Sequence, residues 1–316
     1  MKLQRKLFGL TIAATLGIAS WVIGPSLATP PGSNGLLIYQ TQNGSRGTLF
    51  TIRPDGSGRR RIASAPGDAA PDWSRDGSKI VFAVEHANGP LFCSIVLANS
   101  DGTGLTELSG GQTGCEGQPS FTPDGRRIVF GHYDDKNETE NILSMDLAGG
   151  DRRQLTRRND SGTVDPNVSP DGRWITFVRA KAEMLKALFR MRADGSGVRR
   201  LTPFTWDVFD SKHDWSPDGK LILLTRNADF AQPGRSANLV TIHPDGSGPR
   251  YLTHFKGGAT NAFAGSFAPD GRRVVFRLQK KDKFAIAVIG RDGRNLRLLT
   301  RLSREIPRFL DWGAHE

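Results

Sequence analysis

A pattern that recurs about every 47 residues constrains the fold of this chain more than any other feature. A four-residue turn motif, Ser-Pro-Asp-Gly or a close variant, occurs five times. Its aspartates are Asp76, Asp124, Asp171, Asp218 and Asp270, which lie 48, 47, 47 and 52 positions apart. A second Asp-Gly turn and a closing Leu or Ile keep the same period. The second set of aspartates is Asp55, Asp101, Asp194, Asp245 and Asp292, and the closing residues are Ile62, Leu108, Leu155, Leu201, Leu252 and Leu299. Such a period is typical of a repeat architecture.

The chemistry of the turns indicates what each repeat is. Proline presets the first central residue of a type I turn, and glycine takes the left-handed position of a bulged β-hairpin. Short runs rich in β-branched residues follow the first turn, at 79–84, 127–130, 174–178, 221–225 and 273–278. The 37 glycines and 18 prolines agree with a turn-rich chain. Each repeat is therefore predicted to be a four-stranded antiparallel meander.

The two ends of the array are incomplete in complementary ways. A large apolar residue precedes each first turn: Trp73, Phe121, Val168, Trp215 and Phe267. Trp312 repeats this feature near the C-terminus with no hairpin after it, whereas the strand at 36–40 has no such residue before it. An open solenoid would need capping repeats, but a ring closes when the last strand joins the first unit. We therefore predict an all-β, six-bladed β-propeller over residues 36–316, with four-stranded antiparallel blades, closed by the C-terminal strand joining the first blade.

The N-terminus carries the features of a secretory signal peptide. Lys2, Arg5 and Lys6 precede an uncharged apolar run over 7–24, and small residues end at Ala28. We expect a signal peptide over 1–28 and a short linker over 29–35, which places the body in the periplasm or outside the cell. The alternative is an uncleaved anchor, because roughly 18 apolar residues can just span a bilayer. After cleavage we expect a monomer with no transmembrane span, and loss of the three basic residues lowers the formal charge from +11 to +8.

The repeat itself resembles that of a known family. Its order is Trp-Ser-Pro-Asp-Gly, two strands, Asp-Gly-Ser-Gly, one strand and Leu-Thr, which is similar to the WD-like repeats of the TolB propeller family. The resemblance covers residues 36–313 and implies a periplasmic, protein-binding component of a cell-envelope complex. TolB proteins carry an α/β domain ahead of the propeller, and here only residues 29–35 separate the predicted signal from the first strand. The resemblance therefore concerns the propeller alone.

Motifs for catalysis are missing from the sequence. It contains no Gly-x-Ser-x-Gly elbow, His-Glu-x-x-His motif, phosphate loop or dinucleotide fingerprint, and its six histidines are dispersed. We predict no enzymatic activity, no catalytic residues, no metal site and no cofactor. The alternative is a propeller enzyme of the lyase or lactonase type that uses carboxylates at the channel mouth and a bound cation.

The candidate ligand site lies at the mouth of the predicted channel. Asp68, Glu116 and Asp210 stand five residues before their large apolar residues, with Asp165 and His213 nearby and Trp206 in the segment 203–209. Converging carboxylates could hold a cation or a basic peptide group, so we expect a protein or peptide partner there. The other interpretation is that these side chains only cap turns and solvate the loops.

The two cysteines permit one further interpretation. Cys93 and Cys115 lie in the same repeat of a chain expected to be exported, where a disulfide bond is chemically allowed. The alternative is one buried thiol and one thiol in a loop.

The arginines also follow the repeat. They occupy the predicted fourth, outermost strand, at 59–61, 152–153, 199–200, 250 and 297. Charges on an exposed edge strand prevent aggregation through that edge. The alternative is an anionic partner such as a cell-surface polymer. Nucleic acid is disfavoured because no stacking aromatic residues are interleaved with the arginines.

Overall fold

The computed structural model describes residues 33–43, 46–62, 68–86, 93–109, 114–156, 162–181, 185–209, 211–227 and 234–314. The predicted signal peptide over 1–28 and most of the linker over 29–35 lie outside these ranges. The described residues form 24 strands and one short 3-10 turn, η1 (Phe204–Trp206). No helix within these ranges is long and apolar enough to cross a membrane.

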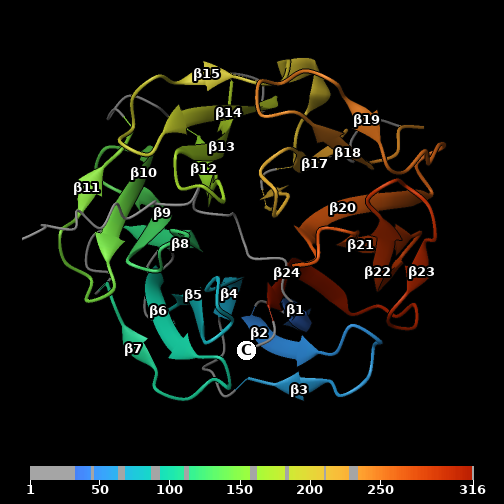
Figure 1. Ribbon diagram of the computed structural model, residues 1–316, viewed down its shortest axis with the longest axis horizontal. Coiled ribbons are helices and arrows are strands. Elements are labelled where there is room, and N and C mark those ends of the chain that lie inside the picture. Colours follow the sequence, from blue (N-terminus) through green and yellow to red (C-terminus); the bar gives the residue numbers. More distant parts are fainter. Residues whose placement is uncertain are drawn as a thin grey trace, which may run out of the picture.

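The strands form five sheets arranged around a central axis, as Figure 1 shows, and all but one of the strand pairings are antiparallel. One four-stranded sheet joins the two ends of the chain: β24 (Ile306–Ala314), β1 (Asn34–Asn43), β2 (Arg46–Ile52) and β3 (Arg60–Arg61). The eight-stranded sheet contains β4 (Asp68–Trp73), β5 (Lys79–Glu85), β6 (Cys93–Asn99), β7 (Thr106–Glu107), β8 (Cys115–Phe121), β9 (Arg127–Asp134), β10 (Thr139–Asp146) and β11 (Arg153–Gln154).

The three remaining sheets have four strands each. The first contains β12 (Thr163–Val168), β13 (Trp174–Ala180), β14 (Lys186–Arg192) and β15 (Arg199–Arg200). The second contains β16 (Asp214–Trp215), β17 (Ile222–Arg226), β18 (Asn238–Ile242) and β19 (Arg250–Tyr251). The third contains β20 (Thr260–Phe267), β21 (Arg273–Lys280), β22 (Lys283–Gly290) and β23 (Arg297–Leu298).

The sheets have the radial arrangement of a β-propeller. The innermost strands contact one another in a closed circle, in the order β24, β4, β8, β12, β16, β20 and back to β24. Apolar cores lie between neighbouring sheets, where the face of one sheet packs on the next. One such core joins Ile38 and Leu49 of the closing sheet to Trp73 and Phe82. Burial of apolar surface between every pair of neighbours therefore holds the ring together.

The closing sheet joins the two incomplete ends of the sequence. β24 pairs antiparallel with β1, and Leu37 stands opposite Trp312. Trp312 thus lies on an innermost strand, as its position in the repeat predicts. β1 begins at Asn34, inside the segment expected to be a linker.

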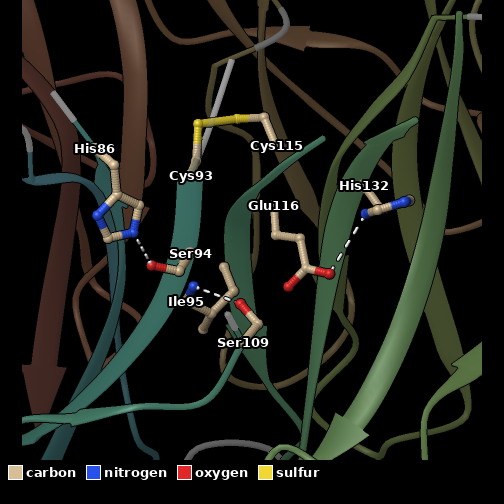
Figure 2. The surroundings of a disulfide bond; sticks show 8 residues. All are labelled: His86, Cys93, Ser94, Ile95, Ser109, Cys115, Glu116 and His132. Carbon is tan, nitrogen blue, oxygen red and sulfur yellow. Dashed lines mark hydrogen bonds and ion pairs between the residues drawn. A yellow bond between two sulfur atoms is a disulfide. The ribbon is translucent and has the colours of Figure 1, made fainter. Parts of the chain in front are cut away.

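The eight-stranded sheet departs from the expectation of separate four-stranded blades. Its halves, β4–β7 and β8–β11, are two meanders of the predicted kind, but β6 and β8 also form a short parallel pairing. That pairing is at Cys93 and Cys115, which are joined by a disulfide bond with 4.4 Å between their Cα atoms. The bond joins the start of β6 in one meander to the start of β8 in the other, beside Glu116 and His132 (Figure 2). A covalent link that the repeat does not contain therefore merges two units into one sheet.

The first turn is stabilised by its own side chains. In the Ser169 turn, the hydroxyl donates to Asp171 Oδ1 at 2.6 Å and accepts from the backbone amide of Trp174 at 2.9 Å. The amide of Gly172 donates to the carbonyl of Ser169 at 2.8 Å. The same bonds recur at Ser216, so the motif closes the hairpin between the first and second strands.

The threonine of the Leu-Thr pair that ends a repeat binds a backbone amide of the third strand. The hydroxyl of Thr202 accepts a hydrogen bond of 2.9 Å from the backbone amide of Leu188 on the third strand. Thr156, Thr253 and Thr300 make the equivalent bond, also at 2.9 Å. Because the fourth strand is only two residues long, this hydroxyl satisfies an amide that the strand ladder leaves unpaired.

The glycine of the second turn sets the distance between neighbouring sheets. Gly195 has φ +85°, and a Cβ atom there would lie 2.3 Å from the carbonyl oxygen of Leu155 in the preceding sheet. Gly246 stands in the same relation to Leu201, at 2.5 Å. The periodic glycine and the periodic leucine are therefore the two sides of one contact between sheets.

Candidate functional site in the central channel

The channel is lined by the residue that immediately precedes each large apolar residue. These lining residues are Asp72, Ser120, Asn167, Asp214, Ser266 and Asp311. Four of them accept a hydrogen bond from the backbone amide of the next innermost strand. One of these bonds runs from Trp312 to the hydroxyl of Ser266 at 2.8 Å, and the other three end on carboxylates. These three run from Phe121 to Asp72 at 3.0 Å, from Phe267 to Asp214 at 2.8 Å and from Trp73 to Asp311 at 3.0 Å. The polar lining thus ties adjacent innermost strands to each other.

A lysine occupies the middle of this channel. Lys212 Nζ lies 3.3 Å from Asp311 Oδ1 and 3.5 Å from Asp72 Oδ1, and its side chain is only 8% exposed. Burial opposes its charge, but Asp311 and Asp72 outweigh burial and raise the pKa of Lys212 above its ordinary value. Lys212 therefore stays charged and serves as the cation of the carboxylate group.

The carboxylates around Lys212 have perturbed acidity. Burial and the charge of Asp311 raise the pKa of Asp72 to about 7, although Lys212 opposes the shift. Burial likewise raises the pKa of Asp214 well above its ordinary value. One ammonium group does not neutralise three buried carboxylates, so Asp72 and Asp214 resist ionisation.

The channel narrows at this group. A cavity of about 110 Å³ lies on the side of the Ser-Pro-Asp-Gly turns, which we call the turn end. At the level of Lys212, Asp165 and Phe309 the free space is only about 10 Å³. That is about the space of one water molecule, so the described side chains leave little room at this level of the channel.

Asp165 and His213, both predicted site residues, contact each other. Asp165 Oδ2 lies 2.7 Å from His213 Nδ1, and His213 Nε2 lies 2.8 Å from the hydroxyl of Thr176. The indole of Trp215 donates to the same hydroxyl at 2.9 Å. His213 is fully buried, and this network joins the sheet of β12–β15 to that of β16–β19. Asp165 also lines the narrow part of the channel.

Glu116 and Trp206 lie apart from that network. Glu116 Oε1 accepts a bond from Arg152 and lies 3.4 Å from His132 Nδ1 (Figure 2). Burial opposes ionisation of Glu116, but bonds from His132 and Ser109 outweigh it and lower its pKa.

Trp206 belongs to η1 and is half-buried. The guanidinium carbon of Arg226 lies 4.9 Å from the centre of its ring system. Of the other two predicted site residues, the side chain of Asp68 and all of Asp210 lie outside the described part of the chain.

One protein-family model matches this chain. Residues 69–314 match the family model described as the TolB beta propeller domain, which is most of the chain. This chain belongs to the TolB β-propeller family. An uncharacterized protein of Agrobacterium fabrum is 30% identical over 166 residues, or 49% of this chain and 52% of that protein. A Bacillus subtilis protein named as an uncharacterized peptidase, YuxL, is 32% identical over 111 residues, or 34% of this chain and 16% of that protein.

The solved structures show the same fold. TolB from Acinetobacter baumannii superposes with a TM-score of 0.70 at 23% identity, covering 88% of this chain and 66% of that chain. The matched part of the chain spans about half the length of the Agrobacterium fabrum protein and a smaller part of the Bacillus subtilis protein. The similarity to TolB is a similarity of the propeller.

The central group of this TolB-family channel was not among the residues predicted from the sequence. The predicted carboxylates stand five positions before the large apolar residue, whereas Asp72, Asp214 and Asp311 stand one position before it. The available signal was a polar residue at that position in every unit. No such pattern indicated Lys212, because the corresponding position of the other units is not a lysine. The described residues contain no group of three or more His, Cys, Asp or Glu side chains arranged to hold a metal ion.

The arginines of the outermost strands are partly engaged. Arg250 donates to the carbonyl of Asp292 at 2.8 Å, and Arg297 donates to that of Pro54 at 3.0 Å. Both bonds reach from an outermost strand to the second turn of the next sheet. Arg199 and Arg200 are exposed on β15. These strands are only two residues long, which leaves little free edge for pairing with another chain.

Proposed function

We propose that this chain is an exported, non-catalytic TolB-family propeller that binds a protein or peptide of the cell envelope. The partner would meet the loop end of the channel, where connections between consecutive sheets lead into the innermost strands. We also propose residues 1–28 as signal peptide, 29–35 as linker and 36–316 as propeller. Counting β4–β7 and β8–β11 as one blade each would make six blades, and each would then have one innermost strand ending in a large apolar residue.

The observation that carries this proposal is the filling of the channel by Lys212. Its ammonium group stands between Asp72 and Asp311, where it occupies the place that a cation attracted by these carboxylates would take. With about 10 Å³ free at that level, a substrate does not fit between these groups. A rigid ring with a filled centre offers its mouth, rather than its interior, as a binding surface.

We retain the predicted residues as the proposed ligand site: Asp68, Glu116, Asp165, Asp210, His213 and Trp206. Trp206 is the most accessible aromatic group among them, and large aromatic residues contribute strongly to protein interfaces. Asp165 and His213 would act by holding the innermost strands in place. The doubly substituted protein Asp165→Ala, Asp210→Ala is expected to lose affinity for its partner by calorimetry.

Site-specific photocrosslinking in intact cells tests the location of the partner. A photoreactive amino acid replaces Trp206 at the loop end or Arg272, an exposed residue at the turn end. We expect adducts with an envelope protein from position 206 and none from position 272. Equal adducts from both positions would contradict a loop-end site, and recovery of the protein in the cytoplasmic fraction would contradict export.

An anionic cell-surface polymer is a second possible partner, because exposed arginines recur on the outermost strands. Measuring retention on an anionic polymer across a salt series tests this idea. Retention equal to that of a variant with Arg199→Ser and Arg200→Ser would contradict it.

An enzymatic role of the lyase or lactonase type is the competing proposal. The specific observation in its favour is that Asp72 has a pKa of about 7, a value suited to general acid–base catalysis. Metal analysis of the purified protein, combined with Asp72→Asn in a panel of lactone and uronate substrates, tests it. Stoichiometric metal or a turnover lost in Asp72→Asn would favour the enzyme.

A further inference from the structure

One buried arginine has no counter-ion among the described residues. Arg277, on β21, is 6% exposed, and no hydrogen bond or ion pair links it to another described side chain. Its Nε atom is buried without an acceptor. Arginine is among the residues least often fully buried unless it is paired. Arg277 therefore has unused capacity to bind a negative charge.

Two aromatic rings lie against the guanidinium group of Arg277. Its guanidinium carbon lies 4.0 Å from the ring centre of Phe263 and 5.5 Å from that of Phe209. Such contacts place the cation against the faces of aromatic rings and do not require its N–H donors. Two aromatic rings thus hold the group, and no described side chain accepts a hydrogen bond from it.

The charged residue Arg308 near Arg277 is also an arginine, so it carries the same positive charge. Arg308, an exposed residue at the start of β24, acts on Arg277 through its charge. Burial and this like charge lower the pKa of Arg277 to about 9. An anion that binds to Arg277 would relieve both the cost of its burial and its repulsion by Arg308.

The place of these groups in the fold makes them relevant to a partner. Phe263 and Arg308 belong to the neighbouring innermost strands β20 and β24, and Phe209 belongs to the connection that leads into β16. All three lie toward the loop end of the channel, where Figure 1 shows β20 beside β24.

We infer that Arg277, with the positive charge of Arg308 nearby, forms a carboxylate-binding site beside the loop end of the channel. The planar guanidinium edge of arginine matches the two oxygens of a carboxylate, which it binds through parallel hydrogen bonds. The inference rests on the proposed function only for the source of the carboxylate, which would be an acidic side chain or the C-terminus of a peptide. A free small carboxylate would use the same edge.

Acetate tests the site without any partner. The full-length mature protein is titrated with sodium acetate by calorimetry, and its melting temperature is compared in acetate and in chloride at equal ionic strength. We expect acetate to raise the melting temperature of the native protein. Arg277→Met keeps the apolar stem and removes the donors, so acetate affinity should fall at least about tenfold. No difference between acetate and chloride in the native protein, or an unchanged response in Arg277→Met, would overturn the inference.

Two more variants keep the test decisive. Arg308→Met is exposed and should fold normally, and its acetate affinity should fall severalfold; unchanged affinity would overturn the assignment even if Arg277→Met does not fold. Arg273→Met is the matched control on the same strand. Its guanidinium carbon lies 5.1 Å from Trp312, but it is already paired with Asp270 at 3.7 Å. Its acetate response should equal that of the native protein, and a loss as large as in Arg277→Met would contradict the site.

A pair of capped peptides distinguishes the source of the carboxylate. A peptide with one glutamate should displace acetate, and its glutamine twin should not. Equal displacement by both peptides would overturn a carboxylate ligand. Because these measurements use no envelope partner, they can fail while the photocrosslinking at Trp206 succeeds, and the reverse also holds.

Discussion

The backbone amide of Trp73 donates a hydrogen bond of 3.0 Å to Oδ2 of Asp311, a residue 238 positions further along the chain. The bond joins the innermost strand at the C-terminal end to that of the next sheet. The contact is tight, because a Cβ atom on Gly313 would lie 2.8 Å from the Trp73 ring. Asp311 therefore contributes twice: it closes the ring toward Trp73, and its other oxygen holds Lys212.

Removal of Asp311 should destabilise the protein strongly. Asp311→Ala leaves the Trp73 amide without an acceptor and Lys212 with one fewer carboxylate, so we expect a loss of about 3 kcal/mol in the free energy of unfolding. Asp311→Asn keeps an acceptor and should cost less. Urea denaturation measures both. Asp282→Ala is the control, since Asp282 pairs with Arg304 only at the exposed surface; a similar loss in both proteins would contradict the role of Asp311.

Stability should depend on pH through Asp72. Its pKa is about 7 in the folded protein and 3.8 ordinarily, so the folded state binds more protons than the unfolded chain between these values. The contribution of Asp72 to the free energy of unfolding is therefore present below pH 4 and is lost as pH rises through 7. Asp72→Asn should flatten this part of the profile, measured by denaturation at several pH values.

Asp194 provides a control of opposite sign. Hydrogen bonds from Ser196 lower its pKa below the ordinary value, so its contribution is present at neutral pH and is lost as pH falls. Asp194→Asn should leave the slope between pH 4 and 7 unchanged. A profile that stays the same in Asp72→Asn would show that Asp72 ionises normally.

The disulfide bond should contribute to stability by restricting the unfolded chain. Cys93 and Cys115 are 22 positions apart, and closing a loop of that length contributes about 3 kcal/mol. Cys93→Ser, Cys115→Ser should lower the melting temperature to that of the reduced native protein. A reductant should have no effect on the double variant; if it also has none on the native protein, the bond does not form.

Two glycines of different turns should respond differently to alanine. Gly195→Ala places a Cβ atom 2.3 Å from the Leu155 carbonyl oxygen, whereas Gly219 has open space around its Cβ position. Both have positive φ, so each alanine should cost about 1 kcal/mol in backbone strain. Gly195→Ala should cost at least about 2 kcal/mol more, since backbone must move. Equal melting temperatures of the two variants would contradict the tight contact.

Much of the propeller could be predicted because its signals are local and periodic. A Ser-Pro-Asp-Gly turn such as the one at Ser169 makes its bonds within six residues, so the turn and its flanking strands are readable from the sequence alone. Closure of the ring could be predicted for a related reason, since Trp312 is the large apolar residue at the same position of the repeat as Trp73. The cysteines left two possibilities open, because the pairing depends on how closely β6 and β8 approach.

The candidate site was less predictable because its groups come from unrelated positions. Lys212 lies beside Asp72 across 140 positions and departs from the repeat, so no periodic pattern connects the two. Arg277 belongs to a strand of β-branched and apolar residues, and only the structure shows that it is buried against Phe263 with no counter-ion in the part of the chain that is described.

The sequence by itself determined the repeat unit, the hairpin turns and the circular order, because each depends on bonds within a unit or on a feature repeated at one position. The tertiary structure alone decided the rest. It placed Lys212 among the carboxylates, buried Arg277 with no counter-ion among the described side chains and merged two meanders through Cys93 and Cys115. The physical reason is that charge neutralisation and packing between sheets depend on distances through space, which a one-dimensional period does not contain.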